Sequence, residues 1–352
     1  MTFTKTQYLL ATEANILSFI FTHTEQGLGY AISTGPKLIL LHQEEVHEEW
    51  ELPKSSIDWT KEVQLQLSSN DQYLAIYNTY GRYGFVLDLH SHQKLLDLNR
   101  QDYQVEHSKF PLLFFEKEGK DYLIHGTDWN KIDITALASK TVLTERNNTN
   151  YKEPHYLDFF YGELHLSPGG KTLLSSGWLW GPASYFRFIE LDAWMHKNKN
   201  QAELGSPANV CIMSYYWDRA LCWIDENRLA YLYDPKEEGF DKEELIEEGF
   251  NSNQGHIIVY NIHQYQAEKK IPFDGFSRNE YHEATPDCRL FHFEQQLLIS
   301  SAERGTYAID VHTGETWSHD PGIYLEQRIA GSNRFFRIYE GKKIEIIELT
   351  SA

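Results

Sequence analysis

The stretch GELHLSPGGKTLLSSGWLWGPASYFRFIEL, residues 162–191, decides how the rest of the chain is interpreted. Glu163 to Ser167 and Lys171 to Ser176 have the partial apolar and polar alternation of strands that bury one face. Pro168-Gly169-Gly170 between them predicts a tight turn, because glycine adopts positive φ without steric cost. A loop rich in Trp and Gly follows, and Tyr185 to Leu191 have the pattern of a third strand. The stretch therefore predicts three consecutive strands.

Weaker copies of this unit recur along the whole chain. Each copy has a short polar turn between two apolar strands, followed by a third strand and a polar-ended fourth. The copies span residues 16–52, 63–99, 110–146, 163–215, 220–273, 289–320 and 326–349. Repeats of about this length, built from four strands, are typical of β-propellers. The sequence therefore predicts an all-β fold, a seven-bladed β-propeller.

The last copy ends one strand short. Lys5 to Thr12 has the pattern of an outer strand, and we expect it to pair with Lys343 to Leu349. An N-terminal strand that completes the last blade closes the ring and removes an exposed sheet edge. We predict a single domain over residues 1–352, with insertions at about 192–209 and 234–256. Short helices are expected in these insertions, at Asp192 to Lys197 and at Asp241 to Glu248.

Three phrases resemble repeats of known propellers. They are Ser69 with Tyr73 to Ile76, the segment LSPGGKTLLSSG at residues 166–177, and AIDVHTGET at Ala308 to Thr316. The chain resembles the WD-repeat-like and bacterial seven-bladed β-propeller superfamily. The Trp-Asp and Gly-His pairs of true WD repeats are absent from the expected positions, and Trp217-Asp218 stands elsewhere. The resemblance implies the fold and carries no activity with it.

The composition narrows the classes of partner. The formal net charge is −19, and no Lys/Arg run offers a basic face, so we predict no nucleic-acid binding. An acidic surface favours basic partners. We see no signal peptide and no apolar run near the ~20 residues that span a bilayer. Cys211, Cys222 and Cys288 lie in or beside apolar segments and suggest buried, reduced thiols. We therefore expect a cytoplasmic monomer without membrane contact.

Function is expected on one face of the propeller. Turns between first and second strands are short and polar, whereas loops on the opposite face are long and rich in Trp, Tyr and Arg. Rigid aromatic rings and arginine dominate binding hot spots. The candidates for contacting a partner or ligand are Tyr80, Arg82, Tyr83, Asp128, Trp129, Trp178, Trp180, Tyr216, Trp217, Asp218, Arg219, Tyr281, His282 and Arg304. The alternative is that these rings pack between blades, and that Asp218 and Arg219 form an ion pair that fixes loops.

No recognised catalytic motif occurs in the sequence. His90-Ser-His92 lacks an evident third ligand, so we predict no metal site and no cofactor. The favoured hypothesis is a non-catalytic binding propeller that recognises a protein, a peptide or a small polar ligand through the aromatic-rich face at the channel mouth. The alternative is a hydrolase or lyase whose site is assembled across blades from Asp128, Asp218, His155 and His282. A scaffold that uses the blade rims is a third possibility.

Overall fold

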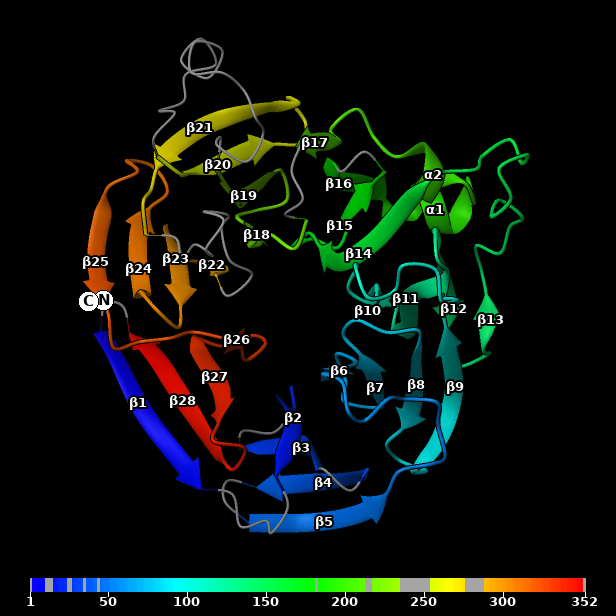
Figure 1. The fold of residues 1–352 in the computed structure, drawn as a ribbon, viewed down its shortest axis with the longest axis horizontal. Helices are drawn as coiled ribbons and strands as arrows, with labels where there is room; N and C mark the ends of the chain where they lie inside the picture. The colour runs from blue at the N-terminus through cyan, green and yellow to red at the C-terminus, as the bar shows by residue number, and fades with distance from the viewer. Residues whose placement is uncertain are drawn as a thin grey trace. The chain divides into compact units, whose positions relative to one another are not determined.

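Strands form nearly all of the regular structure in the part of the chain that the structure describes. A computed structural model describes residues 2–9, 15–23, 27–33, 36–42, 45–180, 183–212, 217–234, 254–275 and 288–350. In this part of the chain the strands form seven four-stranded antiparallel sheets, each built mainly from consecutive segments (Figure 1). The protein is therefore a seven-bladed β-propeller, as the repeats predict. Its contacts divide it into two compact units, Met1–Leu157 with Gln327–Ala352, and Asp158–Glu326.

The first unit contains blades one, two, three and seven. Blade one comprises β2 (Ile16–Phe21), β3 (Leu28–Ser33), β4 (Lys37–His42) and β5 (Glu45–Glu51). Blade two comprises β6 (Val63–Leu67), β7 (Tyr73–Asn78), β8 (Tyr83–Asp88) and β9 (Gln93–Asn99). Blade three comprises β10 (Leu112–Lys117), β11 (Lys120–Asp128), β12 (Lys131–Ala136) and β13 (Thr141–Val142). Blade seven comprises β26 (Gln327–Arg328), β27 (Arg334–Tyr339), β28 (Lys343–Thr350) and β1 (Thr2–Leu9).

The second unit contains blades four, five and six. Blade four comprises β14 (Phe159–Leu166), β15 (Thr172–Leu179), β16 (Ala183–Glu190) and β17 (Val210–Ile212). Blade five comprises β18 (Leu221–Trp223), β19 (Arg228–Tyr233), β20 (His256–Asn261) and β21 (Gln266–Pro272). Blade six comprises β22 (Arg289–Phe293), β23 (Gln296–Ser301), β24 (Gly305–Asp310) and β25 (Thr316–Asp320).

Two short helices, α1 (Leu191–His196) and α2 (Gln201–Leu204), lie in the first of the two insertions. The position of α1 confirms the helix expected at Asp192 to Lys197. The helix expected at Asp241 to Glu248 lies outside the described residues, as does most of the insertion at 234–256. None of the helices in the described ranges has the length and apolar character needed to cross a membrane.

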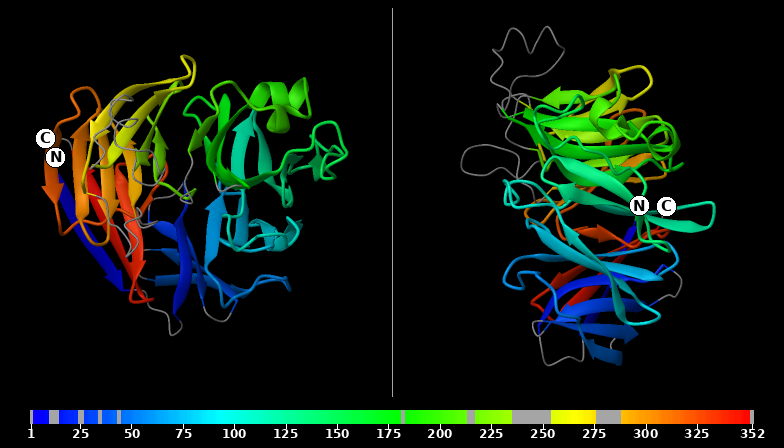
Figure 2. Two further views of the ribbon diagram at one scale, coloured as in Figure 1. Left: turned by 45° about the horizontal axis from the view of Figure 1, so that its top comes forward. Right: turned by 90° about the vertical axis from the view of Figure 1, so that its right-hand side faces the viewer.

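The N-terminal strand completes the last blade, as predicted. β1 pairs antiparallel with β28 from Thr2 opposite Thr350 to Leu9 opposite Lys343, and the two lie side by side in Figure 1 and in the left view of Figure 2. A polar ladder crosses three strands at the middle of this pairing. The buried Glu345 carboxylate accepts hydrogen bonds from Gln7 Nε2 at 2.9 Å and from Arg337 Nε at 2.8 Å. The pairing begins three residues earlier than the expected Lys5.

The hydrophobic core consists of clusters between neighbouring blades. In the first unit, Leu38 of β4 packs with Leu65 and Phe85 of blade two, and the rings of β2 pack with blade seven. In the second unit, Phe186 of β16 packs with Tyr231 of β19. Middle strands such as β8 and β20 therefore bury side chains on both faces of their sheets.

Polar turns at one end of the sheets hold adjacent blades together. The turn at Pro168-Gly169-Gly170 forms as predicted, with Gly170 at φ +70°. Ser167 Oγ donates to Glu226 Oε1 at 2.7 Å, and the Glu226 carboxylate also accepts from the Gly169 amide at 2.5 Å. This links the turns of blades four and five. In the first unit, His23 Nδ1 of blade one lies 2.7 Å from Asp71 Oδ1 of blade two, which links the turns of these two blades.

The three cysteines differ in their exposure. Cys288 is buried and Cys222 is half-buried, but Cys211 is exposed. The expectation of three buried thiols is therefore wrong for Cys211, because it lies in the outer strand β17 on the face that it shares with Tyr185, which is itself only half-buried.

Candidate functional site

Trp178, one of the predicted tryptophans, meets Phe160 on blade four and forms the base of an aromatic stack. Trp178 lies opposite Phe160 in the β14–β15 pairing, and their rings stack at 3.9 Å with 6° between the planes. β15 continues to Leu179, so Trp178 belongs to the strand and not to the predicted loop. Gly177 allows this arrangement, because a Cβ there would lie 2.2 Å from the Phe160 carbonyl oxygen. Trp178 is only 4% exposed and is part of the blade's packing.

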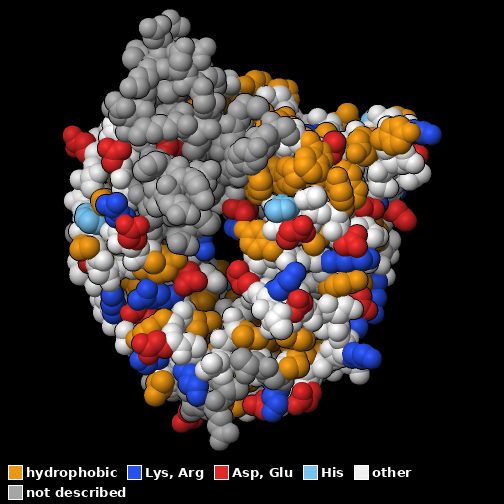
Figure 3. Space-filling model, in the orientation of Figure 1, with side chains coloured by type: hydrophobic (Ala, Val, Ile, Leu, Met, Phe, Trp, Pro, Cys, Tyr) orange, Lys and Arg blue, Asp and Glu red, His pale blue; other side chains and the backbone are white. Residues whose placement is uncertain are grey.

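Two further rings extend the stack toward solvent. Trp217 lies against Trp178 with ring centres 5.1 Å apart, and its carbonyl accepts a hydrogen bond from Ser176 Oγ at 2.7 Å. Trp180 stands edge-on to Trp178 at 5.0 Å and to Phe160 at 5.6 Å. It remains 50% exposed. We call Phe160, Trp178, Trp180 and Trp217 the blade-four stack, and Figure 3 shows hydrophobic side chains gathered over the β14–β16 region.

The indole nitrogen of Trp178 has no hydrogen-bond acceptor within the part of the chain that the structure describes. Buried Trp N–H groups usually find an acceptor, and an unmade bond of this kind costs about 1–3 kcal/mol. The position of Trp178 therefore depends on ring packing alone. The stacked partners Phe160 and Trp217 supply that packing.

Arg219 supports the connection that carries Trp217. Its side chain is buried, with 4% exposure, and its Nη1 donates to the Leu232 carbonyl of β19 at 2.8 Å. Asp218 precedes it in the same connection. The guanidinium thus contacts the backbone of blade five. A contact between Arg219 or Asp218 and a ligand stays a prediction.

In the first unit, Arg82 and Tyr83 contact each other. The Arg82 guanidinium lies 5.0 Å over the Tyr83 ring and donates from Nε to Asn99 Oδ1 at 2.8 Å. Its other nitrogens reach Gln101 at 3.3 Å and Asp102 at 3.4 Å. Tyr80 is partly exposed in the preceding turn. These contacts hold the turn between β7 and β8 against the loop that follows β9.

A second aromatic group forms around Trp129. The Trp129 ring lies edge-on to Tyr103 at 5.1 Å and to Tyr156 at 6.4 Å. The Asp128 carboxylate accepts a hydrogen bond from the Trp129 backbone N–H at 2.8 Å and so shapes the turn between β11 and β12. Tyr103 and Tyr156 are not among the predicted site residues. Both are aromatic residues in long connections between blades, which is the same signal that selected Trp217.

Arg100 is a structural residue that the sequence did not reveal. It is 3% exposed, and every N–H group of its guanidinium is bonded. The acceptors are the carbonyls of Gly81, Val105, Ser108 and Lys109 and the Ser108 hydroxyl, at 2.7–3.1 Å. Burial lowers the pKa of Arg100 to about 9. Arg100 therefore fixes the loop 101–110, which carries Tyr103.

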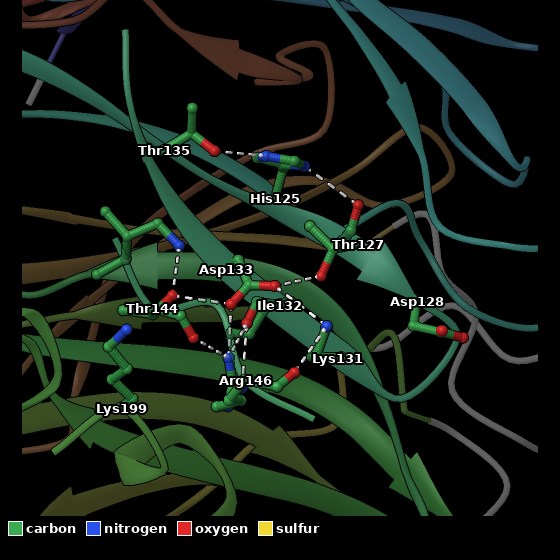
Figure 4. Close-up of polar contacts among 12 residues, drawn as sticks. His125, Thr127, Asp128, Lys131, Ile132, Asp133, Thr135, Thr144, Arg146 and Lys199 are labelled. Carbon is green, nitrogen blue, oxygen red and sulfur yellow. Dashed lines mark hydrogen bonds and ion pairs between the residues drawn. The ribbon is translucent and has the colours of Figure 1, made fainter. Parts of the chain in front are cut away.

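A buried polar network lies in blade three (Figure 4). Asp133 is 1% exposed and accepts hydrogen bonds from Arg146 Nη1 at 2.6 Å, from Thr144 Oγ1 at 2.9 Å and from Thr127 Oγ1 at 2.5 Å. Lys131 Nζ lies 3.6 Å from the same carboxylate. Both oxygens of Asp133 are thus occupied and away from solvent, so the network stabilises the blade and offers no open group to a substrate.

His125 lies in the same blade, on β11. Its Nε2 is 2.9 Å from Thr135 Oγ1, and its Nδ1 is 3.2 Å from the Gly126 carbonyl. Burial lowers the pKa of His125, so its neutral form is favoured. His92 stacks on Trp50 at 4.4 Å with 10° between the planes, which gives one histidine of the His90-Ser-His92 segment a packing role.

The other predicted site residues are only partly described. Arg304 is exposed on the turn between β23 and β24 and contacts Glu303 at 3.5 Å. Tyr216, Tyr281 and His282 lie outside the described residues. Within the described ranges, His, Cys, Asp and Glu form no group of three or more that could hold a metal ion.

Comparisons with known proteins support the fold alone. No family model matches the sequence, and no curated protein matches it either. Among solved structures, the chain is similar to "Structure of U3-55K", with a TM-score of 0.57 and 10% identity over 97% of this chain and 98% of that chain. In all, 1407 solved chains match this chain, so the fold by itself does not select a function.

Proposed function

We propose that this protein is a non-catalytic binding propeller and that the blade-four stack is an anchor point for a protein or peptide partner. A propeller fold is compatible with a binding or scaffold role in general. The observation that carries the proposal is the contrast between two tryptophans two residues apart. Trp178 is buried and held from both sides, whereas Trp180 stands on that base and is half exposed.

This arrangement suits recognition because the exposed ring is already ordered. A ring fixed before binding loses little conformational entropy when a partner covers it, and aromatic anchors of this kind dominate interface energetics. The net charge of −19 favours a partner segment that carries Lys or Arg, since a cation attracts both the acidic surface and the indole face.

The turns between the first and second strands, at the opposite end of the sheets, also support placing the binding site at the blade-four stack. There, polar turn residues such as Ser167, Glu226 and Asp71 bond to neighbouring blades of their own unit. Their hydrogen-bonding capacity is used in holding blades together. The alternative function, a hydrolase or lyase, gains no additional support from the described contacts of its predicted residues.

The proposal is tested by comparing capture of partners by the wild-type chain and by two single variants. Trp180→Ala removes the exposed anchor of the blade-four stack. Trp317→Ala removes a tryptophan that is 63% exposed on the outer strand β25, and is the matched control. We expect a partner captured by wild type and Trp317→Ala to be lost from Trp180→Ala, all three being folded by circular dichroism. Equal capture by the wild type and both variants would refute the assignment of the anchor.

The same experiment separates partner classes. Competition with a lysine-rich peptide and with its glutamate-substituted counterpart tests the basic character of the partner. If only small polar molecules compete, the site binds a small ligand instead of a protein segment.

A further inference from the structure

A cavity between blades seven and one, inside the first unit, has a composition that no role described above explains. Its volume is about 130 Å³. Tyr8 of β1, Ile344 and Ile346 of β28 and Arg334 of β27 line one side, and Phe19 and Phe21 of β2 line the other. The cavity therefore combines apolar walls with one guanidinium and one phenol.

The apolar walls pack closely against one another. Phe19 and Phe21 meet edge-to-face at 4.7 Å, and both contact the Phe336 ring, at 5.7 and 5.2 Å. Ile344 and Ile346 belong to the same buried cluster. An apolar cavity of about 150 Å³ in another protein is large enough to hold benzene. The present cavity is thus close to the size of a single aromatic ring.

Arg334 supplies a cation to this space. It alternates with Phe336 and Ile338 along β27, so all three side chains share the sheet face toward blade one. Its backbone amide donates to Ser332 Oγ at 3.2 Å, but within the described residues its guanidinium makes no hydrogen bond or ion pair. Its cross-strand neighbour Glu348 is exposed and not within ion-pair distance of it. A partly buried guanidinium without an anion is a ready recognition group for a carboxylate.

We propose that this cavity binds a small aromatic carboxylate, with the ring between Phe19, Phe21 and Ile346 and the carboxylate on Arg334. The Tyr8 hydroxyl is a second donor, since it too has no hydrogen-bond partner among the described residues. A neutral aromatic amide fills the same volume but forms weaker, uncharged hydrogen bonds with the guanidinium. An aromatic amine places two cations together. The site lies in the first unit and is independent of the blade-four stack.

The experiment measures binding of phenylacetate, phenylacetamide and phenethylamine to the full chain by ligand-observed NMR titration. We expect phenylacetate to bind at least about tenfold more tightly than phenylacetamide, because a charge-assisted hydrogen bond is roughly twice as strong as a neutral one. Phenethylamine is expected to bind most weakly. Arg334→Gln should abolish the preference for the acid. Arg328→Gln, an exposed arginine on β26 of the same blade, is the matched control and should keep it.

Glu348→Gln is a second test that does not depend on a substitution inside the cavity. Removing the negative charge across from Arg334 should strengthen phenylacetate binding. The proposal is overturned if the folded wild-type chain fails to bind phenylacetate at tens of millimolar, or if the acid and the amide bind equally. It is also overturned if Arg334→Gln leaves the preference intact, or if Glu348→Gln weakens binding of the acid.

Discussion

Replacing Trp178 or Trp180 with alanine should separate stability from binding. Trp178 is 4% exposed and stacked on both faces, and large-to-small changes at such positions cost about 3–5 kcal/mol. Trp180 is 50% exposed, so it buries at most about 125 Å², half of the ~250 Å² of a large aromatic side chain. At about 25 cal/mol per Å², its loss costs no more than about 3 kcal/mol, and less if the unfolded chain is compact.

The assay is urea unfolding followed by far-UV circular dichroism, which does not depend on the fluorescence of the tryptophan that is removed. We expect the transition of Trp178→Ala to move to clearly lower urea than that of Trp180→Ala. For partner binding, Trp180→Ala is the informative variant. It should stay folded but bind the partner about 30-fold more weakly, which corresponds to a hot-spot loss of about 2 kcal/mol.

Trp178→Phe refines the test, because phenylalanine keeps a ring against Phe160 and removes the indole N–H that lacks an acceptor. Its cost should be well below that of Trp178→Ala. If Trp180→Ala destabilises the protein as much as Trp178→Ala, or if Trp178→Phe is as harmful as alanine, the stacking argument is incorrect.

Three further predictions concern the polar interior. Arg100→Lys replaces five bonded N–H groups with at most three and should lower the free energy of unfolding by about 2–4 kcal/mol, with faster amide exchange in loop 101–110; unchanged exchange there would contradict the role given to Arg100. Glu345→Gln should cost about 2 kcal/mol by urea unfolding, since one of its two donor neighbours then faces an NH₂ group; no measurable change would show that the ladder to the N-terminal strand is not stabilising. Burial lowers the pKa of His125 and of His256. The unfolded chain therefore takes up protons first, so stability should be full above about pH 6.5 and fall as the pH drops below that value. A urea midpoint identical at pH 7.5 and pH 5.5 in the wild type, or a His125→Asn variant with an undiminished pH effect, would argue against this.

Local sequence patterns were sufficient to predict the strands and turns of the blades. Alternation in segments such as VQLQL at β6 depends only on a strand's two-residue period, and the turn before β15 depends on Gly170, which takes positive φ. Neighbouring residues encode both features. The missing fourth strand of blade seven was predicted for the same reason, although the register of β1 was not. Register depends on contacts such as Gln7 with Glu345, which join positions at opposite ends of the chain.

The sequence by itself thus determined the repeat, the fold class and the residue types that gather in the long loops. Only the tertiary structure decided which of those residues are buried. Trp178 and Trp180 stand two positions apart in the same Gly-rich phrase, yet one is packed between two rings and the other is half exposed. Likewise nothing local distinguishes Arg100, whose partners come from two loops, or Arg334, whose cavity forms only when blades seven and one pack together. Burial and pairing between blades depend on side chains distant in sequence, and periodicity within one strand carries no information about them.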